Sequence, residues 1–298
     1  MHHEAQRQQA LDAYRIVDSL PEAAYEDIVR IAAAVCDVPT ALITLVDRDR
    51  QWFKARLQFD ARETPRDEAF CDHAIRTPDR LLEVSDATLD PRFANYPNVG
   101  ADGGVRFYAG MPLVTPGGAA IGTVCVVDDQ PRTLDDGQRD ALAALARLTI
   151  NLFEGRLRDL MVQRAQALAS PVAGPTHEPC TVAVYEVQGA AAAADRLGER
   201  ALERELQSLS DALDAIAPTG CSVNRVSGSA ETIAVLHGAD NARTLERMAE
   251  AVEQFQARTG LRVLVGTAHE GHANERPEDI FARADAALFQ QKARPSAT

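Results

Sequence analysis

The sequence predicts an α+β protein of two domains joined by one long helix. Its 298 residues suit two domains of about 150 residues each, and a hydrophobic fraction of 46% with 25% charged residues is typical of folded chains. Helical patterns come first and are followed by short strand-like runs up to about residue 130. From 135 to 169, leucines then recur every three or four residues without an interrupting proline.

The charge balance argues against two classes of partner. Acidic residues outnumber basic ones by 44 to 31, which gives a net charge of -13. Such a chain repels the phosphates of nucleic acids and anionic lipid headgroups. We therefore expect neither a nucleic-acid nor a membrane partner, and the simplest role of this charge is solubility.

Cysteine usage and the N-terminal sequence indicate a cytoplasmic protein. The five cysteines are widely spread, odd in number and without a CxxC pair, so neither a disulfide framework nor a zinc knuckle is expected. The first twenty residues lack the apolar core of a signal peptide. No run approaches the roughly 18 to 20 apolar residues that a membrane span needs.

The first domain is assigned to residues 1–134. Apolar residues at helical spacing predict helices at 5–16 and 22–36, separated by Leu20 and Pro21 because proline starts helices better than it continues them. Short apolar runs predict strands at 41–47, 51–57, 81–86, 106–114 and 120–128. Helices followed by hairpin-connected strands indicate an antiparallel sheet with flanking helices.

A single helix is predicted for 135–169. One domain can hardly bury a helix of this length, so we expect a homodimer that pairs through it. The alternative is an amphipathic helix packed on its own sheet, and Gly155 weakens a continuous seam. Residues 170–179 are rich in proline and small residues and are expected to be a linker.

The second domain, 180–298, alternates strands and helices. The predicted order is a strand at 181–187, a helix at 189–217, a hairpin at 224–238, a helix at 240–258, a strand at 261–270 and a helix at 277–292. This alternation predicts a sheet covered by helices in a ferredoxin-like or nucleotidyl-cyclase-like order.

The first domain resembles the GAF domains that precede histidine-kinase and GGDEF modules in bacteria. The resemblance rests on five segments in the family's order: 10–55, FCDHAI at 70–75, DPRFANYPNV at 90–99, VRFYAGMPL at 105–113 and IGTVCVVDDQPRTL at 121–134. It implies a PAS-like antiparallel sheet with flanking helices and a cup formed by one sheet face and its loops. It also implies a sensor of an unknown small ligand or of redox state.

Five side chains are candidates for lining this cup. Arg106 and Tyr108 are two apart on one predicted strand and should share a face. Cys71 and His73 follow Phe70. The fifth candidate, Trp52, lies where a predicted edge strand meets a loop, and Phe53 and Lys54 follow it there.

Structural roles are the alternative for the same residues. The aromatic residues could be core, namely Phe70, Phe93, Phe107 and Tyr108, and Arg106 could form an ion pair with Asp86 or Asp90. Cys71 and His73 alone supply too few ligands for zinc. Some GAF domains reduce free methionine sulfoxide with a reactive and a resolving thiol, parts for which Cys71 and Cys125 are available, but their surroundings do not resemble that subfamily.

The second domain resembles a GGDEF domain, most clearly in PEDIFARADAALFQQKA at 277–293, and also in the strand at 261–270 and the hairpin at 224–236. The resemblance implies that an active member holds two divalent cations with carboxylates of the hairpin and the first strand. Here the signature is replaced by Ser227, Gly228, Ser229, Ala230 and Glu231, so that serine and alanine stand at the two acidic positions. Glu186 is the only carboxylate left on the first strand, and alanines at 190–194 remove the side chains that would bind GTP.

The sequence therefore predicts a regulatory protein rather than an enzyme, with a sensor domain and a degenerate GGDEF domain that acts as an interaction or allosteric module on a protein partner. We expect no catalytic residue, no metal and no cofactor. One alternative is a weak diguanylate cyclase that makes cyclic di-GMP from GTP with a displaced metal site at Glu186 and Glu231. Another is a nucleotide receptor without turnover, in which Arg225 and Lys292 supply positive charge, although Lys292 also suits the last turn of a helix as a solvated cation.

Overall fold

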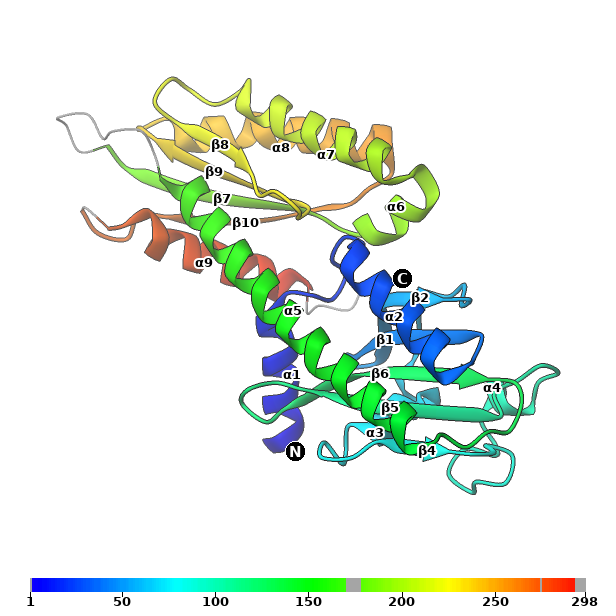
Figure 1. Ribbon diagram of the computed structural model, residues 1–298. Coiled ribbons are helices and arrows are strands. Elements are labelled where there is room, and N and C mark those ends of the chain that lie inside the picture. Colours follow the sequence, from blue (N-terminus) through cyan, green and yellow to red (C-terminus); the bar gives the residue numbers. More distant parts are fainter. Residues whose placement is uncertain (1, 170–177, 274, 293–298) are drawn as a thin grey trace. The chain divides into compact units, whose positions relative to one another are not determined.

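The computed structural model describes residues 2–169, 178–273 and 275–292, so most of the expected linker at 170–179 lies outside the described residues. The chain divides into two compact units, Met1–Leu157 and Arg158–Thr298 (Figure 1). Both units contain helices and a sheet, which confirms the predicted α+β class.

Unit 1 is built on a six-stranded antiparallel sheet in the order β3-β2-β1-β6-β5-β4. Its strands are β1 (Thr40–Val46), β2 (Arg50–Leu57), β3 (Glu63–Pro65), β4 (Leu82–Val84), β5 (Phe107–Val114) and β6 (Ala120–Asp128). All of them except β3 were predicted to within a few residues. β3 escapes prediction because three residues are too few to show an alternating pattern.

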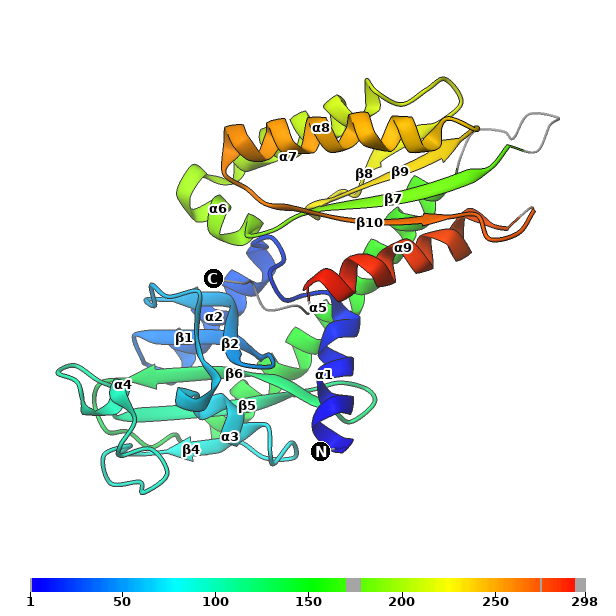
Figure 2. The ribbon, with the colours of Figure 1, turned by 180° about the vertical axis from the view of Figure 1, so that it is seen from behind.

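Helices lie on both faces of this sheet (Figure 2). α1 (His2–Tyr14) and α2 (Ala23–Cys36) cover one face, together with the first part of α5 (Asp136–Leu168). The short α3 (Phe70–Ala74) lies against β1, β5 and β6 on the other face, and η1 (Arg66–Glu68) and α4 (Pro97–Gly100) lie in the connecting loops. Asp37 ends α2 with a φ of 53°, and its N–H donates to Ala33 O.

Cross-strand pairing defines what we call the cup face, the sheet face that carries α3. Leu42 pairs with Cys125 and Thr44 with Thr123, and residues directly opposite each other in an antiparallel ladder point to one face. Ile43 and Leu45 point to the opposite face, which α2 covers. An irregularity between Ile43 and Thr44 shifts the register with β2, so that Ile43 pairs with Ala55 and Thr44 with Phe53.

The residue left over at this irregularity is Lys54, a cation buried on the helix-covered side. Its ammonium group donates to Ser19 Oγ at 2.9 Å, to Leu20 O at 2.6 Å and to Glu22 Oε1 at 2.8 Å, and its side chain is 0% exposed. Burial lowers the pKa of Lys54 to about 8, although the charge of Glu22 opposes that shift.

The same carboxylate connects this cluster to α5. Arg156 Nε donates to Glu22 Oε1 at 3.0 Å, and Arg156 Nη1 donates to Arg15 O at 3.2 Å. Phe153, one helical turn earlier, packs against the rings of Tyr14 and Tyr25 with centroids 6.0 and 5.4 Å apart. α5 is thereby fixed to the segment between α1 and α2.

Unit 2 contains a four-stranded antiparallel sheet in the order β10-β7-β9-β8. Its elements are β7 (Cys180–Val187), α6 (Ala190–Leu197), α7 (Glu199–Asp214), β8 (Ser222–Arg225), β9 (Glu231–His237), α8 (Asn241–Thr259), β10 (Val263–His269) and α9 (Pro277–Lys292). Apart from the pair α6 and α7, this is the βαββαβ order expected from the sequence.

The helix predicted at 189–217 is wrong in one respect, because the structure divides it into α6 and α7 at Gly198. That residue has a φ of 84°, which interrupts the helix, and its N–H closes α6 by donating to Ala194 O. The alanines at 190–194 are almost all buried and form the first turns of α6.

One core cluster of unit 2 lies between its sheet, α9 and the end of α5. Val182, Val184 and Ile233 pack with Ile280 and Leu288 of α9. The last turns of α5 add three buried side chains to the same cluster, Leu160, Ala167 and Leu168. α5 therefore provides core residues to unit 2 as well as to unit 1.

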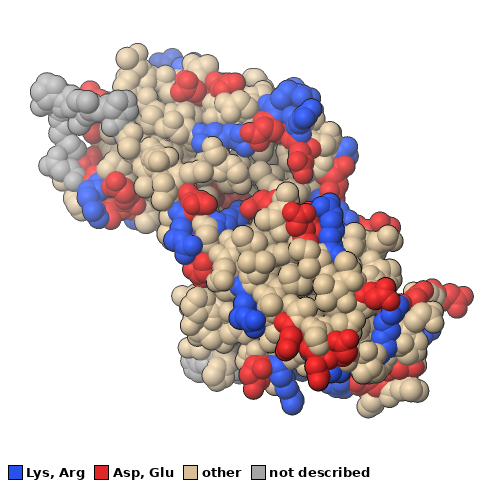
Figure 3. Space-filling view, in the orientation of Figure 1, with Lys and Arg blue, Asp and Glu red and all other residues tan. Residues whose placement is uncertain are grey.

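The surface carries charges of both signs. On the face drawn in Figure 3, basic and acidic side chains are interspersed among uncharged residues, and neither sign forms a continuous field. In the parts of the chain that the structure describes, no helix has the length and apolar character needed to cross a membrane.

The titration of Lys54 should be measurable in the stability of unit 1. A folded-state pKa of about 8 against 10.5 in the unfolded chain means that the unfolded chain binds more protons between these values, so stability rises with pH in this window. For wild type relative to Lys54→Met, we expect a gain of about 3 kcal/mol in the free energy of unfolding from pH 8 to 10.5. Urea unfolding followed by the fluorescence of Trp52 measures it.

Lys54→Arg is the matched control, because arginine retains the charge but does not titrate in this range. It should lose the pH-dependent gain as Lys54→Met does. Parallel wild-type and Lys54→Met curves between pH 8 and 10.5 would contradict the assignment.

Candidate functional site

The cup face of unit 1 is closed by a stack of aromatic side chains. The Phe70 ring lies between Phe93 and Tyr108, with centroids 4.4 and 5.0 Å away, and Tyr96 meets Phe70 edge-on at 5.8 Å. Phe70, Phe93 and Tyr108 are at most 6% exposed. These residues pack against one another, as the structural alternative expected.

Beneath this stack lies a cluster of two thiols and three hydroxyl groups. Cys71 Sγ lies 3.2 Å from the Tyr108 hydroxyl and 4.0 Å from Cys125 Sγ, and it accepts a hydrogen bond of 3.1 Å from Thr123 Oγ1. Thr123 Oγ1 is also 2.9 Å from Thr44 Oγ1. The cluster joins α3 to the three central strands.

Hydrogen bonding gives the two thiols different acidity. Burial raises the pKa of Cys71, but hydrogen bonds from Cys125, Thr123 and Tyr108 outweigh it and lower that pKa to about 7. Burial and the neighbouring Cys71 raise the pKa of Cys125. Cys71 is therefore the thiol that ionises first.

Gly110 makes room for the tyrosine of this cluster. A Cβ atom built on Gly110 would lie 2.1 Å from the Tyr108 hydroxyl oxygen. Gly110 pairs with Cys125 across β5 and β6, so the phenol lies over the strand and its hydroxyl group reaches the thiols. A larger residue at this position would displace Tyr108.

Arg106 does not lie beside Tyr108 on the cup face, contrary to the sequence prediction. Arg106 precedes β5, and its guanidinium group donates to Val99 O at 2.7 Å, which fixes the loop before the strand. The alternative ion pair with Asp86 or Asp90 is also wrong, because Asp90 binds Arg92 at 2.6 Å and Asp86 accepts from Thr88. Main-chain carbonyls, which carry no pattern in the sequence, are the partners of Arg106.

Trp52 is also misplaced by the sequence interpretation. β3 pairs with β2, so β2 is not an edge strand, and Trp52 pairs with Leu45 on the helix-covered face. It is 2% exposed and does not reach the cup face. His73 does lie near the aromatic stack, where Nε2 is 3.2 Å from the Tyr96 hydroxyl group and burial lowers its pKa.

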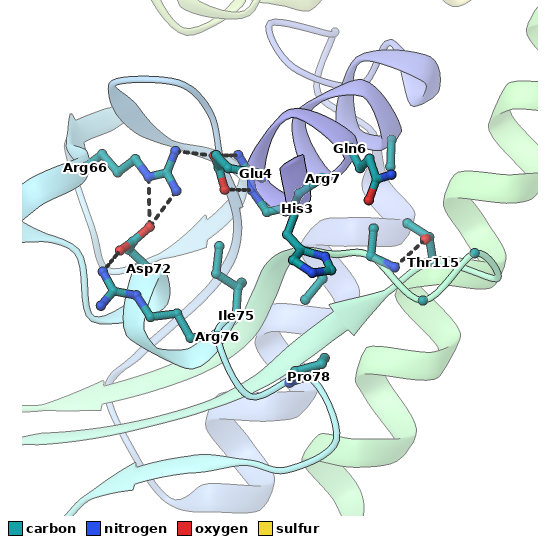
Figure 4. Close-up of a pocket in the computed structure, with 15 residues that line it drawn as sticks. His3, Glu4, Gln6, Arg7, Arg66, Asp72, Ile75, Arg76, Pro78 and Thr115 are labelled. Carbon is teal, nitrogen blue, oxygen red and sulfur yellow. Dashed lines mark hydrogen bonds and ion pairs between the residues drawn. The ribbon is translucent and has the colours of Figure 1, made fainter. Parts of the chain in front are cut away.

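A groove of about 880 Å³ runs along α1, α3 and the hairpin between β5 and β6 (Figure 4). Its charged wall is a chain of ion pairs in which Arg66 binds both Glu4 and Asp72 at 2.7 Å, and Asp72 also binds Arg76 at 2.5 Å. The hydrogen bond from Arg7 lowers the pKa of Glu4 to about 2, with Arg66 adding to the effect. Ile75 and Ala120 form an apolar part of the wall.

In unit 2, the hairpin between β8 and β9 holds the remnant signature in a closed turn. Val226 N–H donates to Glu231 O at 2.9 Å, and Ser229 Oγ donates to Val226 O at 3.0 Å. Ser229 Oγ also accepts from Glu231 N–H at 3.1 Å, and Gly228 has a φ of 68°. Ser227, Ser229 and Ala230 supply no charge to this turn.

The two remaining carboxylates face each other across the sheet, since Glu186 of β7 pairs directly with Glu231 of β9. Arg164 of α5 binds both carboxylate oxygens of Glu231, and its Nε lies 2.9 Å from Oε2. Lys292 of α9 binds Glu186 at 2.5 Å. Like charges placed opposite each other are thus neutralised by cations from two helices.

This pair between Arg164 and Glu231 is shielded from solvent. The two side chains are 9% and 7% exposed, and the guanidinium group also lies 3.8 Å from Asp285 and over the ring of Phe281. Burial alone would lower the pKa of Arg164, but the charge of Glu231 raises it. Sequence reasoning missed Arg164, and the only signal for it was a basic residue within an apolar stripe of the long helix.

Arg225, the other cation predicted to bind a nucleotide, is also paired with a carboxylate. Arg225 binds both carboxylate oxygens of Glu203, at 2.5 and 2.8 Å, and donates to Ser229 O at 3.3 Å. Within residues 2–169, 178–273 and 275–292, no three His, Cys, Asp or Glu side chains come together as a metal site would require.

Comparison with known proteins identifies unit 1. The family model of the GAF domain matches residues 20–151. A cyclic di-GMP phosphodiesterase of Pseudomonas aeruginosa is 41% identical over 129 residues, which are 43% of this chain and 22% of that protein. The chain therefore spans less than a quarter of the length of that relative.

Solved structures of two kinds are similar to parts of the chain. A domain of a sensor histidine kinase from Sinorhizobium meliloti is 19% identical over 48% of this chain and 97% of its own, with a TM-score of 0.36. The GGDEF domain of DgcB from Caulobacter crescentus, solved with c-di-GMP, is 19% identical over 45% of this chain and 81% of its own, with a TM-score of 0.33. Likeness at this level carries no argument, whereas the family match shows that residues 20–151 form a GAF domain.

Proposed function

We propose that this chain is a regulatory protein of cyclic di-GMP signalling, in which the GAF domain is the sensor and unit 2 is a GGDEF-like module that no longer makes cyclic di-GMP. In this proposal unit 2 acts on a protein partner, and the chain works in the cytoplasm. The observation that carries it is the neutralisation of Glu186 by Lys292 and of Glu231 by Arg164.

The chemistry of the cyclase reaction explains why this observation matters. Two divalent cations must be held by carboxylates so that the triphosphate charge is neutralised and the attacking hydroxyl group is oriented. In unit 2 the two carboxylates that remain, Glu186 and Glu231, are paired with an ammonium and a guanidinium group of the chain itself. A metal ion would have to displace both, and the loss of the buried pair with Glu231 opposes that exchange.

The alternative of a weak cyclase has one observation in its favour, the direct pairing of Glu186 with Glu231. It requires Arg164 and Lys292 to move aside when GTP and magnesium bind. A nucleotide receptor without turnover has less support, because both cations proposed to bind phosphates are engaged with carboxylates, Arg225 with Glu203 and Lys292 with Glu186.

We also infer that α5 pairs two copies of the chain. Leu148 and Val162 are 47% and 55% exposed on α5 and two heptads apart, so they share one seam with Gly155 between them. Met161, beside this seam, is 59% exposed.

Nucleotide binding separates the three functions. We expect isothermal titration of the full chain with GTP and magnesium, and with cyclic di-GMP, to give no heat of binding, because the two cations proposed to bind phosphates, Arg225 and Lys292, are engaged with carboxylates. Micromolar binding of GTP together with pyrophosphate release that Glu186→Ala abolishes would establish the cyclase instead. Binding without pyrophosphate release would favour the receptor.

The buried ion pair should dominate the stability of unit 2. Arg164→Met leaves Glu231 buried without its cation, and we expect it to lower the free energy of unfolding by roughly 3 to 5 kcal/mol. Adding Glu231→Gln should restore at least half of the loss, since no uncompensated charge remains. Urea unfolding followed by circular dichroism measures both, with the fluorescence of Trp52 as an internal reference for unit 1. An unchanged midpoint for Arg164→Met would contradict this role of the pair.

Pairing through α5 should depend on the exposed seam. Leu148→Glu combined with Val162→Glu places charges on it, and we expect light scattering coupled to size-exclusion chromatography to report a monomer where wild type is a dimer. Leu197→Glu is the control, because this leucine is also exposed, at 42%, but lies on α6. A dimeric double variant, or a monomeric wild type, would refute the inference.

A further inference from the structure

The cup face carries two buried thiols, Cys71 and Cys125, whose sulfur atoms lie close together. Cys71 stands on the five-residue α3 and Cys125 in the centre of β6, and they are 2% and 1% exposed. Their sulfur atoms are 4.0 Å apart, whereas a disulfide has a bond of about 2.05 Å. A disulfide between them therefore requires the two sulfur atoms to approach each other by about 2 Å.

The neighbouring hydroxyl groups make Cys71 the nucleophile of the pair. Thr123 donates to its sulfur, and the Tyr108 hydroxyl group lies at hydrogen-bond distance from it. Cys36 shows the effect of burial without such donors, since burial raises its pKa to about 11. The pKa of Cys71 falls instead to about 7, so a substantial fraction is thiolate at neutral pH.

We propose that Cys71 and Cys125 are an oxidisable dithiol, which a hydroperoxide converts into a disulfide. The Cys71 thiolate attacks the outer oxygen of the hydroperoxide, the O–O bond breaks, and the alkoxide or hydroxide leaves with the proton that Cys71 had released. Cys125 then attacks the sulfur of the resulting sulfenic acid, and hydroxide leaves with the proton of Cys125 as water. Two thiols are oxidised by two electrons, and one hydroperoxide is reduced.

A small oxidant has a short path to the thiols. Ile75 and Ala120 line the groove of unit 1 and belong to the same buried cluster as Cys71, Tyr108 and Cys125 (Figure 4). One apolar cluster thus borders both the groove and the sulfur atoms. Hydrogen peroxide can reach the thiols during local opening of α3, whereas a larger ligand must displace the aromatic stack.

Oxidation alters the packing of the cup face. The Cys71 sulfur that moves towards Cys125 gives up its contacts with the hydroxyl groups of Tyr108 and Thr123, and Thr123 keeps its bond with Thr44. Because Tyr108 stacks on Phe70, a change at the thiols reaches α3 and the loop that carries Phe93. This site lies in unit 1 and does not depend on whether unit 2 binds nucleotides.

Peptide mapping of the oxidised protein tests the proposal. The reduced full chain is treated with hydrogen peroxide at pH 7, quenched with an alkylating agent and digested without reduction. We expect a mass loss of about 2 Da, carried by a linked pair of peptides that contain Cys71 and Cys125. Cys71 that remains fully alkylated, or a bond joining another pair of cysteines, would overturn the proposal.

Variants then separate the roles of the two thiols. In Cys125→Ser the reaction should stop at the sulfenic acid of Cys71, which dimedone traps, while Cys36→Ser should form the disulfide as wild type does. Thr123→Val removes a donor and should slow the oxidation of Cys71 about fivefold, because a rise of one pKa unit from about 7 lowers the thiolate fraction at pH 7 from about one half to about one tenth. A disulfide signal that survives in Cys125→Ser would refute the pairing.

Discussion

The buried ion pair between Arg164 and Glu231 is the contact on which the packing of α5 against the sheet of unit 2 depends. A carboxylate that is 7% exposed in a sheet must have a cation beside it, because an unpaired buried charge is far too costly. Here a side chain of α5 supplies that cation.

The same constraint shapes unit 1, where the buried charge is a cation. Lys54 is held by Glu22, and Arg156 of α5 binds the same carboxylate. α5 therefore supplies one arginine to a buried ion cluster in each unit, Arg156 in the first and Arg164 in the second. Since these arginines are about two helical turns apart, a shift or rotation of α5 would strain both clusters.

The sequence predicts much of the fold because hydrophobic periodicity is a local property. β5, β6 and α5 are found within a residue or two, since their apolar residues repeat at the period of a strand or a helix. The break at Gly198 is missed because alanines on one side and leucines on the other continue the helical pattern across it. The glycine alone was too weak a signal, and only its φ of 84° shows the interruption.

The sites are harder to predict because their partners are distant in the sequence or belong to the main chain. Arg106 binds a carbonyl group of a loop, and nothing in its own neighbourhood distinguishes that partner from Asp86 or Asp90. Trp52 lies on the helix-covered face because it pairs with Leu45, and the pairing of β3 with β2 makes β2 an inner strand. Cys71 and Cys125 were recognised as a possible pair of thiols, yet their distance and their hydroxyl donors follow only from the sheet register that places Thr123 and Thr44 side by side.

The packing of the cup face also constrains what the GAF domain can sense. The stacked rings of Phe70, Phe93 and Tyr108 occupy the place where the resemblance would put a ligand. A large ligand must first separate these rings, and it gains affinity only if its own contacts exceed those it breaks. A hydroperoxide does not require the rings to separate, because it acts by a covalent change at two sulfur atoms that already lie 4.0 Å apart. A filled cup therefore favours a chemical signal over a bound one.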